Sequence, residues 1–236
     1  MSDLTGKSVL VFGGSSGIGF GVAEAAVKAG AKVTIASRSQ DKIDAALAKL
    51  EGAEGVSLDT GDAEALETFF KGHDAFDHVF CSAASTKVSA VRELPLEDAY
   101  ASVNSKFWGA YRVTKFAKVK EGGSITLVSG FLSVRPKPGA AIQGAINAGL
   151  EGLTRGLALE LAPVRVNCIS PGLVMTEMYD SLEGDGRKKM FDNAAETLPV
   201  GQVGKPEHIA IQAIALMENP YMTGTTSFID GGGRLA

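Results

Sequence analysis

Apolar runs of strand length alternate with helical patterns along almost the whole sequence, and this alternation limits the possible folds more than any other feature. Parallel strands need crossovers of a dozen or more residues, usually helices, so the alternation predicts a parallel sheet covered on both faces. We expect strands at 8–12, 32–36, 55–58, 78–81, 124–128, 165–169 and 226–229, and helices at 17–29, 40–50, 63–70, 96–118, 139–161 and 206–217. Because such crossovers are right-handed, these seven strands predict a doubly wound α/β sheet in three layers, the Rossmann fold.

A single domain is expected for the whole chain, residues 1–236, because no linker or repeat interrupts the alternation. The stretch 173–201, rich in Met, Asp, Glu and Gly, is the one long irregular connection. Long loops in compact domains often bind ligands, so we predict a substrate loop there.

Composition and charge exclude several classes of protein. A net charge of -4 argues against binding to nucleic acid, which depends on clustered Lys and Arg. No apolar run approaches the roughly 20 residues that cross a bilayer, and the first residues lack the pattern of a signal peptide. The histidines show no metal-ligand spacing, and Cys81 and Cys168 are too few for a disulfide framework. We therefore expect a cytoplasmic protein with a small-molecule substrate and no metal, nucleic-acid or membrane partner.

The clearest binding motif lies between the first expected strand and the first expected helix, where the chain reads Gly-Gly-Ser-Ser-Gly-Ile-Gly. Glycines there let the chain turn sharply and let the backbone approach a pyrophosphate. Free N–H groups at the start of the helix then hold the phosphate oxygens. The sequence thus predicts a dinucleotide site that includes Gly13, Ser15, Ser16, Gly17, Ile18 and Gly19.

The end of the second expected strand, Ser37 and Arg38, indicates which dinucleotide is preferred. A carboxylate at this position favours NAD, whereas an arginine accommodates the 2′-phosphate of NADP. No acid is present, and a bond from Arg38 to a phosphate would contribute about 1.5–3 kcal/mol. We predict that NADP(H) is favoured over NAD(H); the alternative is that Arg38 is a solvated loop residue.

These features resemble the short-chain dehydrogenase/reductase family from Gly6 to Gly232, with Phe12 where a threonine is usual in the glycine motif. The resemblance implies that Asp59 holds the adenine amino group and that Asn104 helps to organise the active site. Ser82 and Ala83 stand in an altered form of the family's Asn-Asn-Ala-Gly stretch. The remaining positions that the resemblance assigns to the cofactor are Ala83, Pro171, Gly172, Val174, Thr176 and Asn147, whose amide can hydrogen-bond the ribose.

The resemblance also implies a catalytic serine, tyrosine and lysine. In the family, the tyrosine gives a proton to the carbonyl oxygen, the lysine four residues later lowers the tyrosine's pKa, and the serine orients the substrate. Aligned on the strand 123–129 and on Asn147-Ala148-Gly149, these positions hold Gly130, Gln143 and Asn147. All three catalytic groups are therefore predicted to be absent.

A Tyr-x-x-x-Lys pattern does occur at Tyr111 and Lys115, but it precedes the strand that it should follow. We interpret Tyr111 as a helix residue that packs its ring and exposes its hydroxyl.

Two functions remain open. The first is an NADP(H)-dependent oxidoreductase with an atypical site, which reduces an imine or iminium, an activated C=C or a C=O group. Its candidate catalytic residues are Asn104, Gln143 and Asn147, with Ser129 and Tyr179 as further polar groups. The second is a catalytically inactive NADP(H)-binding or interaction protein, because binding sites can persist after chemistry is lost.

The expected helix 139–161 is rich in Ala and Gly, including Gly144, Gly149, Gly152 and Gly156. Small residues allow close backbone approach, and the family resemblance implies that this helix and the one before it pair between subunits. A homodimer or homotetramer is therefore expected; the alternative is that these small residues pack within one subunit. We interpret both cysteines as structural.

Overall fold

Seven parallel strands form a sheet in the computed structural model, which describes residues 2–180 and 185–236, and their order is β3-β2-β1-β4-β5-β6-β7. The strands are β1 (Ser8–Phe12), β2 (Lys32–Ser37), β3 (Glu54–Ser57), β4 (Phe76–Cys81), β5 (Val119–Val128), β6 (Arg165–Pro171) and β7 (Thr226–Ile229). The order reverses direction between β1 and β4, so a ligand crevice is expected beyond the carboxyl ends of these two strands. The predicted doubly wound sheet is confirmed.

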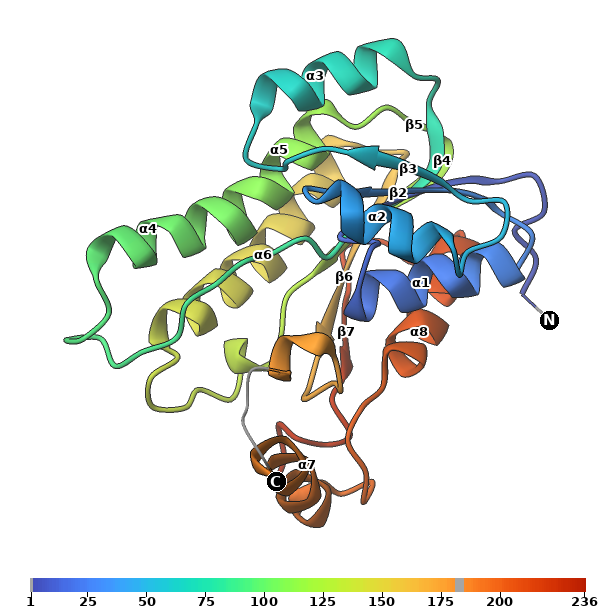
Figure 1. Ribbon diagram of the computed structural model, residues 1–236. Coiled ribbons are helices and arrows are strands. Elements are labelled where there is room, and N and C mark those ends of the chain that lie inside the picture. Colours follow the sequence, from blue (N-terminus) through green and yellow to red (C-terminus); the bar gives the residue numbers. More distant parts are fainter. Residues whose placement is uncertain (1, 181–184) are drawn as a thin grey trace.

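Helices cover both faces of this sheet (Figure 1). Their bounds are α1 (Gly17–Lys28), α2 (Gln40–Leu47), α3 (Ala63–Gly72), α4 (Leu96–Val103), α5 (Gly109–Phe116), α6 (Ala141–Glu160), α7 (Gly186–Thr197) and α8 (Pro206–Glu218). Helices α1, α2 and α8 pack on one face, and α3, α5 and α6 pack on the other.

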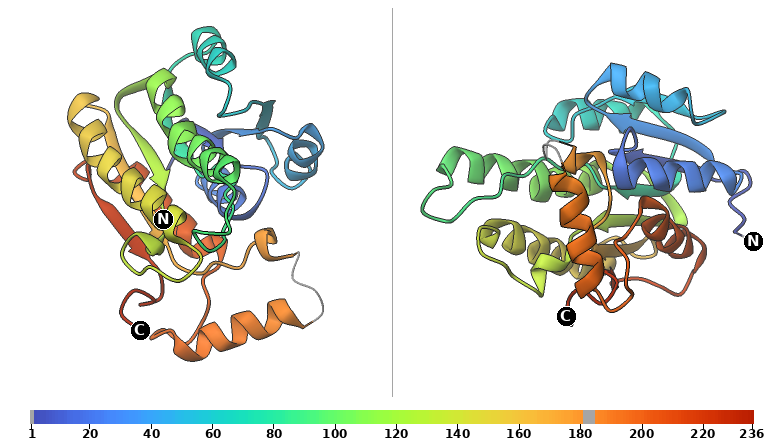
Figure 2. Two further views of the ribbon diagram at one scale, coloured as in Figure 1. Left: turned by 90° about the vertical axis from the view of Figure 1, so that its left-hand side faces the viewer. Right: turned by 60° about the horizontal axis from the view of Figure 1, so that its bottom comes forward.

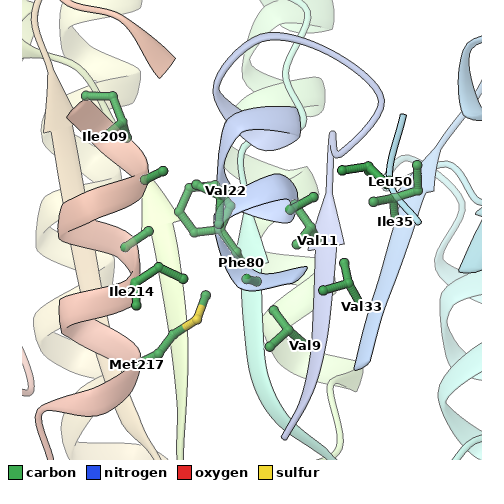
Figure 3. Close-up of a cluster of buried hydrophobic side chains, with 14 of the residues drawn as sticks. Val9, Val11, Val22, Val33, Ile35, Leu50, Phe80, Ile209, Ile214 and Met217 are labelled. Atoms are coloured by element: carbon green, nitrogen blue, oxygen red, sulfur yellow. The ribbon is translucent and has the colours of Figure 1, made fainter. Parts of the chain in front are cut away.

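The residues of β1 show why both faces are covered. Val9 and Val11 lie in the buried cluster with α1 and α8, which Figure 3 shows, whereas Leu10 and Phe12 lie in the cluster on the opposite face. Successive side chains of a strand point to opposite faces, so an unbroken apolar strand must be buried on both. The layers follow directly from this pattern.

Two parts of the chain differ from the sequence-based prediction. The single helix expected at 96–118 is divided by a π-helical segment, Asn104–Trp108, between α4 and α5. The connection expected to be irregular, 173–201, contains the helix α7, which stands apart from the helices that cover the sheet (Figure 2). Residues 181–184 of this predicted substrate loop lie outside the described residues. Only Phe191 of α7 is buried, so its sequence carries almost no apolar periodicity that would have indicated a helix.

Candidate functional site

The glycine-rich turn lies at the carboxyl edge of the sheet, between β1 and α1. Gly13 and Gly17 have positive φ angles of 78° and 52°, which residues with a side chain rarely adopt. A Cβ atom at Gly19 would collide with the carbonyl oxygen of Gly13. These glycines are therefore required by the turn itself.

Contacts bring several of the predicted cofactor residues together around this turn. The Ser15 hydroxyl donates to the Ser37 hydroxyl at 2.9 Å, which links the turn to the end of β2. A Cβ at Gly13 would lie 2.9 Å from the backbone nitrogen of Ala83, and one at Gly17 would lie 3.2 Å from Thr176 Cγ2. The ends of β2, β4 and β6 thus converge on the start of α1.

The start of α1 fits an anionic group such as a pyrophosphate. Ser16, the N-cap residue, makes no side-chain capping bond, and the first turn contains no acidic residue. The first N–H groups of a helix have no partner within the helix and carry the positive end of its dipole. If a dinucleotide is present, the amides of Gly17, Ile18 and Gly19 would hold its phosphates.

The other predicted cofactor residues occupy varied surroundings. Arg38 is exposed at the end of β2. Asp59 is also exposed, and its Oδ1 accepts a hydrogen bond from the Gly61 N–H at 2.8 Å. Pro171 ends β6, and a Cβ on the next residue, Gly172, would lie 2.7 Å from the Cα of Asp230.

Val174 differs from the others because its side chain is part of the buried core, and it forms a parallel bridge with Gly204. The structure therefore gives Val174 a packing role at this edge.

A second polar cluster lies between the π-helical segment, the end of β5 and α6. The Nζ of Lys106 donates hydrogen bonds of 2.7 Å to the backbone oxygen of Ser129 and of 2.7 Å to Asn147 Oδ1. Asn147 is buried, with 1% of its surface exposed. Burial lowers the pKa of Lys106 to about 8, although the acidic groups Cys168 and Glu151 act in the opposite direction.

Glu151 holds the far side of this cluster. Its Oε1 accepts hydrogen bonds from the hydroxyls of Ser129, at 3.0 Å, and Ser133, at 2.6 Å. Asn147 and Glu151 lie one helical turn apart on α6, so both face β5. The result is a connected set of polar groups at the carboxyl end of β5.

The three candidate catalytic residues are placed differently from one another. Gln143 is half-buried in the first turn of α6, one turn before the buried Asn147. Asn104 is exposed, and its Oδ1 accepts a hydrogen bond of 2.6 Å from Arg112 Nη2. The structure therefore brings Asn147 into the cluster with Lys106, while the Asn104 side chain bonds away from it.

Tyr111 is exposed on α5 and contacts Trp108 edge to face, which agrees with its interpretation as a packing residue. Tyr179 is half-buried against Phe191, and burial raises the pKa of its hydroxyl. Cys81 is buried, and burial raises the pKa of its thiol to about 12. This thiol is protonated at neutral pH, as expected of a structural cysteine.

Sequence reasoning missed Lys106. One signal was available: a buried polar residue such as Asn147 needs a hydrogen-bond partner, and a lysine lies two residues after Asn104. Lys106 faces the site because it lies in the π-helical segment, and no comparable signal in the sequence indicates that segment.

Within 2–180 and 185–236, no three His, Cys, Asp or Glu side chains are grouped as metal ligands would be. No helix in the same residues is both long enough and apolar enough to cross a membrane.

Comparison with known proteins adds to this geometry. A family model described as Enoyl-(Acyl carrier protein) reductase matches residues 13–233. The chain is similar to short-chain dehydrogenase/reductase ATR9 of Stachybotrys chlorohalonatus, with 34% identity over 100% of both chains. It is also similar to carbonyl reductase family member 4 of Xenopus laevis, with 30% identity over 97% of this chain and 98% of that protein.

Solved structures show the same likeness. A small-chain dehydrogenase in complex with NADPH is 36% identical, with a TM-score of 0.87 over 98% of this chain and 100% of that one. The MalC Reductase/Diels-Alderase from Malbranchea aurantiaca is 29% identical, with a TM-score of 0.91 over 99% of this chain and 98% of that one. With a family match that spans most of its length and relatives of this identity, the chain belongs to the short-chain dehydrogenase/reductase family of oxidoreductases.

Proposed function

We propose that this protein is an NADP(H)-dependent oxidoreductase whose site lacks the family's serine, tyrosine and lysine, with Gly130, Gln143 and Asn147 at their positions. The observation that carries the cofactor part is the uncapped start of α1, around which the ends of β2, β4 and β6 converge. A relative whose title names an NADPH complex supports the same choice. Arg38, exposed beside Ser37, is the residue proposed to bind the 2′-phosphate.

The proposed reaction is reduction of a group that needs no tyrosine as proton donor: an imine or iminium, or an activated C=C or C=O. A bound cofactor would supply hydride, and an activated C=C or C=O would take its proton from water or from another residue. Gln143 cannot ionise near neutral pH, but its amide can donate a hydrogen bond to an oxygen or accept one from an N–H. An iminium carries its positive charge before it reacts, so it needs only to be oriented and shielded from water. A relative named Reductase/Diels-Alderase is compatible with this class.

Calorimetric titration with NADPH, NADP, NADH and NAD tests the cofactor assignment. We expect NADPH to bind at least about tenfold more tightly than NADH, because the charge-assisted bond from Arg38 is available only to the phosphate. Arg38→Ala should remove this difference, whereas Arg92→Ala, a change at another exposed arginine, should leave it unchanged. Equal affinities in the wild type would contradict the role of Arg38.

Oxidation of NADPH, followed at 340 nm against imines, enones and ketones, tests the reaction. Turnover of any one class supports the oxidoreductase. Tight NADPH binding with no turnover of any compound would favour the second candidate, an inactive NADP(H)-binding protein, which the loss of all three catalytic groups also favours.

A further inference from the structure

Lys106 carries a buried ammonium group with no carboxylate bonded to it among the described residues. Its hydrogen-bond partners are a backbone oxygen and an amide oxygen, each at 2.7 Å. Burying a charge without an ion-pair partner is unfavourable, and an apolar side chain in this place would avoid that cost. A lysine is therefore costly here as a purely structural residue.

The contact with Lys106 determines how the Asn147 amide is oriented. An ammonium group can only donate hydrogen bonds, so the atom of Asn147 that faces it must be the oxygen. The amide nitrogen, Nδ2, then points toward Gly130, where an added Cβ would lie 2.9 Å from it. Gly130 lies two residues after the end of β5, so Nδ2 is the Asn147 atom on the side of the carboxyl edge, where ligands bind in such sheets.

The π-helical segment explains why Lys106, and not Asn104, is in this position. A π-helical turn contains more residues than an α-helical turn, so it rotates the residues that follow it about the helix axis. Asn104, at the start of this segment, bonds to Arg112 on the exposed side, while Lys106, within it, reaches β5 and α6. Such segments occur frequently at functional sites.

We propose that Lys106 is a positioning residue that supplies the positive charge of this site from the π-helical segment and fixes Asn147 as a hydrogen-bond donor toward the cofactor. The lysine of the site thus comes from the π-helical segment, two residues after Asn104, and an asparagine stands at the family's lysine position. The inference deepens the proposed function and rests on it, because the group that Asn147 serves is the bound dinucleotide.

The charged and titratable groups around Lys106 set its pH dependence. Glu151 on α6 and Cys168 on β6 face it, and Glu151 also accepts hydrogen bonds from Ser129 and Ser133. Negative charge on either group favours the ammonium form, whereas burial favours the neutral amine. With a pKa of about 8, Lys106 loses its charge within the range over which the protein can be assayed.

NADPH titrations between pH 7 and pH 10 test the proposal on the full chain. We expect wild-type affinity to fall about tenfold across a midpoint near pH 8, as the charge-assisted bond is lost. Lys106→Met should bind about tenfold more weakly at pH 7 and show no such midpoint. Lys106→Arg keeps its charge at all these pH values and should remain tight at pH 10.

Lys115→Met is the matched control, because Lys115 is an exposed lysine on α5. This variant should behave as the wild type does. A Lys106→Met protein with wild-type affinity and the wild-type pH profile would overturn the proposal.

A second measurement does not depend on NADPH. The pKa of Lys106, read from the ¹³Cε shifts of labelled lysine, should rise in Asn147→Asp and fall in Asn147→Leu, since the first adds an opposite charge and the second removes the acceptor. If neither variant changes the pKa of Lys106, the hydrogen bond between Lys106 and Asn147 does not exist and the inference fails. If the pKa moves as expected but no dinucleotide binds the wild type, the proposed function fails instead.

Discussion

At the scale of single residues, the most informative contact is that between Gly130 and Asn147. The φ angle of Gly130 is 162°, an extended value open to any residue, so its backbone does not require glycine. The obstacle to a side chain is Asn147 Nδ2, 2.9 Å from the position of an added Cβ. A glycine at this position and an asparagine at 147 therefore depend on each other.

We expect Gly130→Ser to lower the free energy of unfolding by about 1–3 kcal/mol, because overpacking forces Asn147 to move. In an Asn147→Ala background the same change should cost at least about 1 kcal/mol less, since the crowded atom is absent. Urea unfolding of the four proteins of this cycle measures the coupling. Strictly additive effects would show that the two sites are independent.

The same contacts show what could be predicted at this scale. The glycines of the turn were identifiable because a strand, a turn and a helix follow one another in the sequence, and Asn147 was identifiable from its alignment with the family's lysine. Lys106 could not be identified from the sequence, because the direction of its side chain depends on a local change from α-helix to π-helix. Asn104 lies only two residues away, on the exposed side.

At the scale of elements, the packing of α1 against its own turn can be tested by a pair of glycine substitutions. Gly19→Ala would place a methyl group against the Gly13 carbonyl oxygen, so α1 must shift and its first amides move with it. We expect NADPH affinity to fall at least about tenfold and the free energy of unfolding to fall by about 1–3 kcal/mol.

Gly72→Ala at the end of α3 is the control for this change. Gly72 is exposed, and no atom lies within 4 Å of an added Cβ. Alanine favours a helix by up to about 1 kcal/mol over glycine, so this variant should be slightly more stable and bind NADPH normally. Calorimetry and urea unfolding distinguish the two; equal affinity for NADPH in both variants would contradict the role of the turn.

Elements were predictable where the core determined them. Seven strands and five of the six expected helices lie close to their expected positions, because most of them bury apolar residues. The helix α7 buries only Phe191, and every side chain of the π-helical segment keeps part of its surface exposed, although the ammonium group of Lys106 is buried. Without an apolar period, neither could be distinguished from its neighbours in the sequence.

At the scale of the whole molecule, stability should fall in mild acid because of His78. Burial lowers the pKa of His78 to about 4, and the positive charge of Arg165 acts in the same direction. The Nδ1 atom of His78 lies 2.9 Å from Ser124 Oγ. The unfolded chain, with a histidine pKa near 6.5, binds a proton before the folded chain does. The contribution of neutral His78 to the free energy of unfolding is therefore fully present above about pH 6.5 and is lost as the pH falls toward 4.

Urea unfolding should show that the free energy of unfolding is about 2–3 kcal/mol lower at pH 4.5 than at pH 7 because of His78. In His78→Gln, which cannot ionise, the difference between the two pH values should shrink by that amount. His73→Gln changes an exposed histidine and should keep the wild-type difference. An unchanged pH dependence in His78→Gln would show that other groups cause the acid loss.

The last prediction concerns assembly. On α6, Gly152, Gly156 and Leu159 share one helix face, and Leu159 is 84% exposed. Trp108 and Tyr111, on the neighbouring π-helical segment and α5, are also exposed, with 46% and 37% of their surfaces accessible. Exposed apolar residues on neighbouring elements are compatible with an interface, and the family resemblance assigns α6 to one, so we expect a homodimer or homotetramer in which α6 packs between subunits. Light scattering should show that Gly152→Glu and Leu159→Glu shift the protein toward the monomer, because each buries an unpaired charge in the interface. Gly72→Glu, at the end of α3, should leave the assembly intact, and a monomeric wild type would refute the expectation.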